Sequence, residues 1–281
     1  MTAGTGLAAG GGSSSSQTES VAWRVACRYH QIRRQVPNHR RRKLLRQLAV
    51  RGVLEKARAI LGAAKRRARL VSQTYREGDA GELDLEATLE RWGGRGWPRP
   101  EDLVVRRREE KRLDCALMVD TSLSMEGKNI ALASTAAAVL AMRLNPLDVS
   151  VILFENRASV AKPLGMRLSL EQIVARILDV PATGYTNIHD ALRCGAQQLS
   201  RSQRRQQCGI LITDGKYTVG GPPLPLASRF SHLHVLMTED YSNDPQLCRS
   251  MALAGHGQML PVRRYEDLPR RIERLLVEIM R

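Results

Sequence analysis

Residues 113–120, LDCALMVD, and the next five residues, TSLSM, decide the fold of this chain. The first segment is almost entirely apolar, which predicts a strand buried on both faces of a sheet. The second segment is short and polar, which predicts a loop at the carboxyl end of that strand. Polar side chains at this end of a buried strand are typical of an α/β sheet that holds a ligand there.

Five more apolar runs follow, and helical patterns separate most of them. The predicted strands are 113–120, 148–155, 158–164, 208–214, 233–239 and 257–262, and the predicted helices are 128–144, 169–179, 187–201, 243–254 and 267–281. This alternation predicts an α/β fold with a doubly wound, mostly parallel, six-stranded sheet. The run 158–164 follows its neighbour after only two residues and contains Pro163, so we expect an antiparallel edge strand there.

The positive charge of the chain is concentrated in one stretch. The 281 residues include 44 Lys and Arg against 28 Asp and Glu, a net charge of +16. Residues 24–76 hold 17 of the basic residues and one acid, Glu55, so the rest of the chain is neutral on balance. An apolar content of 43% excludes a wholly disordered chain.

The region before the sheet has its own patterns. Apolar residues recur at helical spacing over 19–36 and 39–76, which predicts two basic amphipathic helices, and Asp84 is placed to cap a short third helix. The expected organisation is a flexible Gly/Ser tail at 1–18, a basic helical region at 19–92, a linker at 93–111 and the α/β domain at 112–281.

The basic helical region is compatible with three roles. Its most clustered cations are Arg40, Arg41, Arg42, Lys43, Lys65, Arg66, Arg67 and Arg69. They can face an acidic protein partner, neutralise nucleic-acid phosphates or form a solvated helix face. The regular apolar stripe favours packing against protein, and the region lacks a nucleic-acid recognition motif.

No stretch of the sequence predicts a membrane span or a secretory signal. The longest uncharged apolar stretch, 129–142, is shorter than the ~20 residues that a spanning helix needs. The five cysteines are widely spaced and form no C-x-x-C pair, so reduced thiols are expected. These features together predict a cytoplasmic protein.

Five oxygen-bearing residues are predicted to meet at the carboxyl edge of the sheet: Asp120, Ser122, Ser124, Thr186 and Asp214. Their carboxylates and hydroxyls suit a hard divalent cation, with Mg²⁺ expected first and Mn²⁺ or Ca²⁺ as alternatives. Two carboxylates and three hydroxyls do not fill an octahedral shell. The open position suits water or an acidic residue of a partner protein.

This pattern resembles the von Willebrand factor type A (VWA) domain and its metal-ion-dependent adhesion site (MIDAS), in which D-x-S-x-S is followed by a distant Thr and a distant Asp. The resemblance covers residues 112–281. It implies that the two serines and the threonine contact the metal directly, and that the aspartates act through water or from outside the ligand shell. Relatives commonly carry Gly where this chain has Tyr185.

The charged segment before the first core strand extends the resemblance to bacterial VWA proteins that work with MoxR-type AAA+ ATPases, the circle of CoxE, NorD, CobT and the chelatase D subunit. The resemblance implies a separate ATPase partner, since this chain lacks the G-x-x-x-x-G-K-[ST] loop. Tyr185, Met125 and Lys216 flank the predicted metal site and are candidate partner contacts.

Catalysis is not expected. His189 lies near Thr186, but the G-x-S-x-G motif of serine hydrolases is absent. His232 and His234 are interpreted as structural residues rather than metal ligands. The sequence therefore predicts a non-enzymatic adaptor that binds proteins through a divalent metal. The alternatives are a VWA protein that binds nucleic acid through its basic helices, and a metal-independent scaffold.

Overall fold

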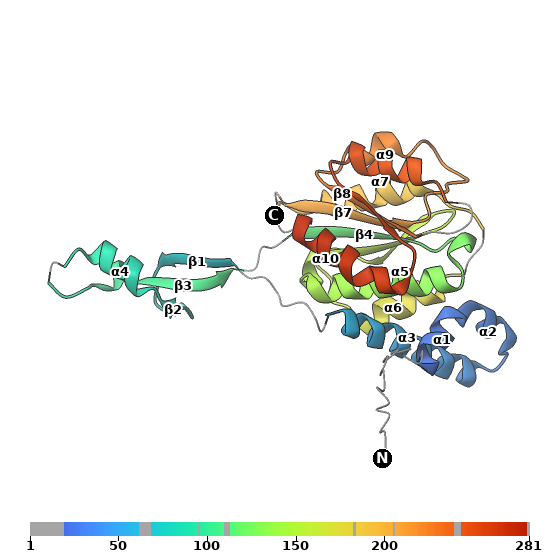
Figure 1. The fold of residues 1–281 in the computed structure, drawn as a ribbon, viewed down its shortest axis with the longest axis horizontal. Helices are drawn as coiled ribbons and strands as arrows, with labels where there is room; N and C mark the ends of the chain where they lie inside the picture. The colour runs from blue at the N-terminus through green and yellow to red at the C-terminus, as the bar shows by residue number, and fades with distance from the viewer. Residues whose placement is uncertain are drawn as a thin grey trace, which may run out of the picture.

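A computed structural model describes residues 20–61, 69–94, 96–109, 113–181, 184–204, 206–238 and 243–279. Its largest part is a six-stranded sheet between two layers of helices (Figure 1). In chain order the strands are β4 (Asp114–Asp120), β5 (Val149–Phe154), β6 (Ala158–Lys162), β7 (Gln207–Thr213), β8 (Leu233–Thr238) and β9 (Met259–Val262).

The order across the sheet is β6-β5-β4-β7-β8-β9, and only β6 runs antiparallel to its neighbour. The predicted six-stranded, mostly parallel sheet with an antiparallel edge strand is therefore confirmed. Strand β4 lies at the centre, flanked by β5 and β7, and all seven of its residues are buried. This burial on both faces explains why its sequence is an unbroken apolar run.

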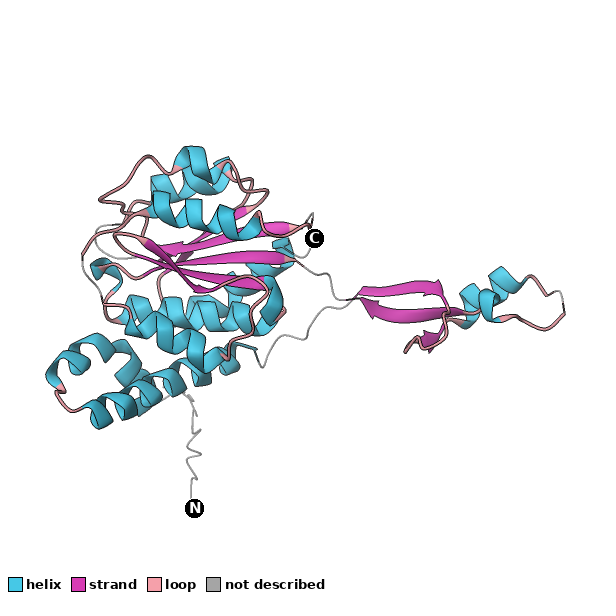
Figure 2. Cartoon of the chain, turned by 180° about the vertical axis from the view of Figure 1, so that it is seen from behind, coloured by secondary structure: helices cyan, strands magenta, loops and turns pink. Residues whose placement is uncertain are grey.

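Each face of the sheet has its own apolar core. The core on one face contains residues of α5 (Lys128–Arg143), α6 (Leu170–Asp179) and α10 (Leu268–Ile279). The other contains residues of α7 (Ile188–Leu199), α8 (Leu224–Ala227) and α9 (Pro245–Ala254). Figure 2 shows the strands between these two helical layers.

The N-terminal helices pack on the α5–α6 layer. They are α1 (Val21–Cys27), α2 (Tyr29–Gln35) and α3 (His39–Leu61), and α3 contacts both α5 and α6. Their apolar side chains, including Trp23 and Val53, belong to the same core as α5 and α6. The apolar stripe that suggested a docking surface for another protein is therefore used within the chain itself.

A separate three-stranded antiparallel sheet has the order β1-β3-β2 and lies to one side of the main sheet (Figure 1). It consists of β1 (Arg69–Thr74), β2 (Glu82–Leu83) and β3 (Val104–Glu109), together with α4 (Leu85–Trp92). The helix predicted for 39–76 is present over His39–Leu61 but is wrong at Arg69–Thr74, which is a strand paired with Val104–Glu109. This partner is distant in sequence and belongs to the segment that was expected to be only a linker. Residues 62–68 of the predicted helix lie outside the described residues.

Two predictions of detail have clear outcomes. Asp84 caps α4, its side chain accepting a hydrogen bond from Ala87 N at 3.3 Å. All five cysteines are free thiols. No helix among the described residues is long and apolar enough to cross a membrane. The predicted tail at 1–18 lies outside the described residues.

Candidate metal centre

Asp120 is the last residue of the central strand β4 and is completely buried. Its Oδ1 accepts a hydrogen bond from Ser122 N at 2.9 Å, and its Oδ2 accepts one from Thr213 Oγ1 at 2.6 Å. Thr213 ends the neighbouring strand β7. The carboxylate is thus held by its own loop on one side and by the adjacent strand on the other, so its orientation is fixed.

The two serines follow in the loop after β4. Ser122 is buried and directly precedes the single 3₁₀ turn Leu123–Met125, and Ser124 lies within this turn and is half-buried. Their hydroxyl oxygens lie 3.1 Å apart, so both point toward the same place. The tight turn explains the D-x-S-x-S spacing, because it places alternate side chains on one side of the loop.

Thr186 comes from the segment before α7 and is buried. Its backbone N donates to Thr218 Oγ1 at 3.0 Å, and its carbonyl oxygen accepts from Thr218 N at 2.9 Å. Next to it, Asn187 N donates to Glu155 O at 2.7 Å, and the Asn187 side chain caps α7. The backbone of Thr186 is therefore held by the loop after β7, while its own hydroxyl is not used in these contacts.

Asp214 follows β7 directly and is completely buried. Its Oδ1 accepts a hydrogen bond from Lys216 N at 3.0 Å. Its Oδ2 is also buried and has no hydrogen-bond partner among the described residues. A buried carboxylate oxygen without a donor is energetically costly, and a bound cation would satisfy it.

The negative charge of the two carboxylates, Asp120 and Asp214, is not balanced by a nearby cationic side chain among the described residues. Burial, with a smaller contribution from the nearby charge of Asp214, raises the pKa of Asp120 to about 7, although the hydrogen bonds from Ser122 and Thr213 act to lower it. Neither carboxylate forms an ion pair with any residue in the described part of the chain. A divalent cation would supply the missing charge and the missing partner of Asp214 Oδ2, so the donor set fits a hard metal ion.

Histidine and cysteine do not contribute to this donor set. Within the described ranges no group of three or more His, Cys, Asp or Glu side chains is arranged to hold a metal. His189 Nδ1 donates to Pro222 O at 3.1 Å, and His234 Nδ1 accepts from Gln258 N at 3.3 Å. Hydroxyl oxygens and two carboxylates remain as the candidate ligands.

Of the three candidate partner contacts, one is wrong. Met125 is completely buried, and its sulfur accepts a hydrogen bond from Thr238 Oγ1 at 3.2 Å, so it anchors the loop rather than facing a partner. Tyr185 is 53% exposed and Lys216 is exposed, so both remain candidates. Sequence reasoning missed two further exposed side chains beside the site, Leu123 and Tyr217.

Sequence reasoning also missed Thr213 and Thr218, which hold Asp120 and Thr186 in place. Thr213 directly precedes Asp214, so its position at a strand end was a usable signal. Thr218 had no such signal, because its role depends on the path of the loop after β7.

The predicted basic residues are only partly placed. Arg40, Arg41, Arg42 and Lys43 are exposed at the start of α3, and Arg69 begins β1. Lys65, Arg66 and Arg67 lie outside the described residues. Other cations of the region bind the domain itself, since Arg46 Nη1 lies 2.9 Å from Asp179 Oδ2 and Arg34 Nη1 lies 3.4 Å from Glu126 Oε1.

The family model for a VWA domain containing CoxE-like protein matches residues 51–235, more than half of the chain. The chain belongs to this family. The match begins inside α3 and ends inside β8, so the matched residues of this CoxE-like VWA protein include part of α3, the small sheet and most of the main sheet. No curated protein matches its sequence.

Solved structures resemble this CoxE-like VWA protein in fold. Proximal thread matrix protein 1 from the mussel byssus, one form of which has a zinc-occupied MIDAS motif, matches with a TM-score of 0.50 and 18% identity over 60% of this chain and 48% of its own. A von Willebrand factor type A protein from Catenulispora acidiphila matches with a TM-score of 0.49 and 17% identity, over 63% of this chain and 45% of its own. An aerotolerance-related membrane protein from Bacteroides fragilis matches with a TM-score of 0.48 and 17% identity, over 59% of this chain and 99% of its own. At these identities the likeness shows the VWA fold alone.

Proposed function

We propose that this protein binds other proteins through a divalent cation, most suitably Mg²⁺, held by Ser122, Ser124 and Thr186 with Asp120 and Asp214 around them. The observation that carries the proposal is the buried Asp214 Oδ2, which has no hydrogen-bond partner among the described residues. Oxygen donors of this kind favour a hard cation. Once bound, the cation offers a coordination position to a carboxylate oxygen of another protein.

The rim of the site supports a protein partner rather than a small molecule. Leu123, Tyr185 and Tyr217 are 49%, 53% and 41% exposed, and each lies one to three residues from a predicted ligand. Exposed aromatic and aliphatic side chains around a polar centre are typical of protein interfaces. Lys216 adds an exposed positive charge that suits an acidic partner segment.

The proposed role is that of an adaptor without catalytic activity. Hydroxyls of Ser122 and Ser124 contact each other, and no described histidine is hydrogen-bonded to either of them, so the arrangement of an activated serine nucleophile is not formed. Because the family is CoxE-like and the chain resembles VWA proteins that accompany MoxR-type AAA+ ATPases, we propose that the partner is a separate ATPase of this class or its client protein.

Metal binding and partner binding are tested separately. Titration calorimetry with Mg²⁺ and Mn²⁺ compares the wild type with Asp120→Ala and Asp214→Asn. Asp179→Asn serves as a matched control, because Asp179 pairs with Arg46 and is not one of the proposed ligands. We expect saturable binding in the wild type and the control, and none in the two site variants. Equal binding by all four proteins would contradict the proposed ligands.

The partner is then tested by affinity capture with a MoxR-type ATPase from the same genome, in Mg²⁺ and in EDTA, with nuclease present. We expect capture only by the wild type and Asp179→Asn, and only in Mg²⁺. Capture that is unchanged in Asp120→Ala or in EDTA would contradict a metal-bridged interface.

The nucleic-acid alternative depends on the exposed cations Arg40–Lys43. It predicts binding that survives EDTA and decreases steeply with salt, because counterions are released from the phosphates. We favour the metal-dependent role because the apolar faces of α1 and α3 already pack on the VWA domain, and because Arg33 and Arg46 bind Asp179.

A further inference from the structure

A second surface, at the edge of the main sheet, has the features of a peptide-binding groove. Strand β9 is the last strand in the sheet order, and among the described strands it pairs only with β8. A hollow of about 350 Å³ lies along β9, between α9 and α10. Its apolar lining includes Leu253, which is 67% exposed, and Met259.

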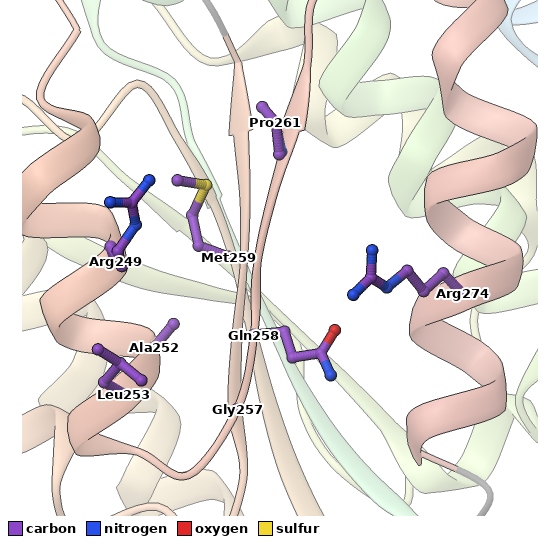
Figure 3. Close-up of a pocket in the computed structure, with 8 residues that line it drawn as sticks. All are labelled: Arg249, Ala252, Leu253, Gly257, Gln258, Met259, Pro261 and Arg274. Carbon is purple, nitrogen blue, oxygen red and sulfur yellow. The ribbon is translucent and has the colours of Figure 1, made fainter.

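Two arginines flank this groove from opposite faces of the sheet. Arg249 lies on α9 and Arg274 on α10, and these helices belong to different cores. Figure 3 shows the two side chains on either side of β9, with Met259 near Arg249 and Gln258 near Arg274. Both arginines are exposed, and neither forms an ion pair with a residue of the described ranges.

The hydrogen-bonding pattern leaves the outer side of β9 open. Val235 N of β8 donates to Gln258 O at 2.9 Å, so the peptide groups of Gln258 face β8. In a strand the peptide groups of successive residues alternate in direction, so those of Met259 and Pro261 face outward. Pro261 has no N–H, and β9 has only four residues, so the edge accepts a short segment and not a long strand.

We propose that this edge binds a short extended segment of a partner protein that carries two acidic residues next to each other. Successive side chains of an extended segment point to opposite faces of the sheet. Adjacent carboxylates would therefore reach Arg249 on one face and Arg274 on the other, while flanking apolar side chains contact Met259 and Leu253. Two acids separated by one residue would lie on the same face, and only one arginine could be satisfied.

This spacing rule separates the proposed groove from general attraction to a basic protein. Two labelled peptides of identical composition are compared by fluorescence anisotropy: Thr-Val-Glu-Asp-Val-Thr, with adjacent acids, and Thr-Glu-Val-Asp-Val-Thr, with acids on one face. We expect the first to bind about fivefold more tightly, the effect of one additional exposed ion pair. Equal affinity of the two peptides, or no binding of either at millimolar concentration, would overturn the proposal.

Variants of the full chain identify the surface. Arg249→Gln and Arg274→Gln should each lower the affinity for the first peptide by up to about fivefold, and the double variant should lower it by up to roughly 25-fold. Arg270→Gln is the matched control, since it is an exposed arginine of α10 that does not line the groove. A loss in Arg270→Gln as large as in Arg274→Gln would overturn the assignment.

Two further measurements test the backbone pairing and the independence of the groove. Pro261→Val adds an outward N–H to β9 and should tighten binding by about fivefold, the effect of one hydrogen bond. Asp120→Ala should leave peptide affinity unchanged, because the groove does not depend on the metal centre. If Pro261→Val bound the peptide more weakly and Asp120→Ala no longer bound it, the peptide would not bind at the β9 edge.

Discussion

The carboxylate of Asp179 and the carboxylate pair Asp120 and Asp214 differ in how their negative charge is compensated. At the end of α6, Asp179 accepts a hydrogen bond from Tyr29 OH at 2.7 Å and lies 2.9 Å from Arg46 Nη1. At the carboxyl edge of the sheet, Asp120 and Asp214 are completely buried, and no described cation pairs with either. The chain itself neutralises Asp179, whereas for Asp120 and Asp214 we propose an external cation.

Asp179 has a structural role. Asp179 fastens the N-terminal helices to the domain, with additional contacts from Arg33 Nη1 to Asp179 O at 2.9 Å and from His30 Nε2 to Leu178 O at 2.7 Å. Burial and then Asp179 raise the pKa of Tyr29, which keeps the phenol protonated as the donor. Part of the basic region that was predicted to bind a partner protein instead pairs with an acidic residue of its own domain.

Metal addition should produce the largest difference between Asp179 and the pair Asp120 and Asp214. At a Mg²⁺ concentration 100 times the dissociation constant, the free energy of unfolding should rise by about 2.7 kcal/mol, since only the folded state binds the ion. Asp179→Asn should keep this increase, and Asp214→Asn should lose it. Urea unfolding with Mg²⁺ and with EDTA measures the effect. An unchanged wild-type midpoint would contradict the metal centre.

Removal of the internal counterion pair should have the next largest effect. Asp179→Asn should lower the free energy of unfolding by about 2 kcal/mol, because the buried Tyr29 hydroxyl and two half-exposed arginines lose their charged acceptor. Hydrogen exchange should increase mainly in α1, α2 and the first half of α3. Faster exchange spread evenly over the main sheet would argue against a local fastening role.

An Asp→Asn substitution at the metal centre should change the free energy of unfolding in the opposite direction when the metal is absent. In EDTA, Asp214→Asn should raise the free energy of unfolding by about 1 kcal/mol, since it removes a buried charge that forms no ion pair among the described residues. Thermal unfolding in EDTA measures this gain. A loss of stability in EDTA would mean that Asp214 is already compensated within the protein, as Asp179 is.

The smallest effect concerns a single partly exposed ion pair. Arg46→Gln should reduce the free energy of unfolding by about 0.5 kcal/mol, because the Arg46–Asp179 pair is screened by solvent. Arg40→Gln is the control, as its exposed side chain should contribute nothing measurable. A cost near 2 kcal/mol for Arg46 alone would show that the stabilisation by Asp179 depends on this pair rather than on Tyr29.

The candidate site illustrates what local sequence can and cannot reveal. Asp120, Ser122 and Ser124 were found because their spacing and their place after an apolar strand are visible in a few residues. Thr218 was not found, and Met125 was assigned to the wrong side of its loop. Both errors concern the direction in which a loop side chain points, which is set by contacts with residues far along the chain, such as Thr238.

In the region before the main sheet, the prediction of secondary structure was correct where contacts are local and wrong where the paired segments are distant in sequence. Helical spacing in residues 39–61 was read correctly, whereas Arg69–Thr74 was assigned to the same helix although it pairs with Val104–Glu109. A helix is stabilised by contacts three and four residues apart, so its pattern is local. A strand needs a partner, and here the partner lies about 35 residues away in a segment that looked like a linker.

By itself, then, the sequence determined the α/β class, the six strands with their antiparallel edge, and the family, because burial patterns and short motifs are local properties of the chain. The tertiary structure alone decided that the basic helices fold onto their own domain, that Asp214 Oδ2 has no partner among the described residues, and that Arg249 and Arg274 flank one open edge strand. Those features arise from residues far apart in sequence, and only the packing of the two helical layers on the sheet brings them together.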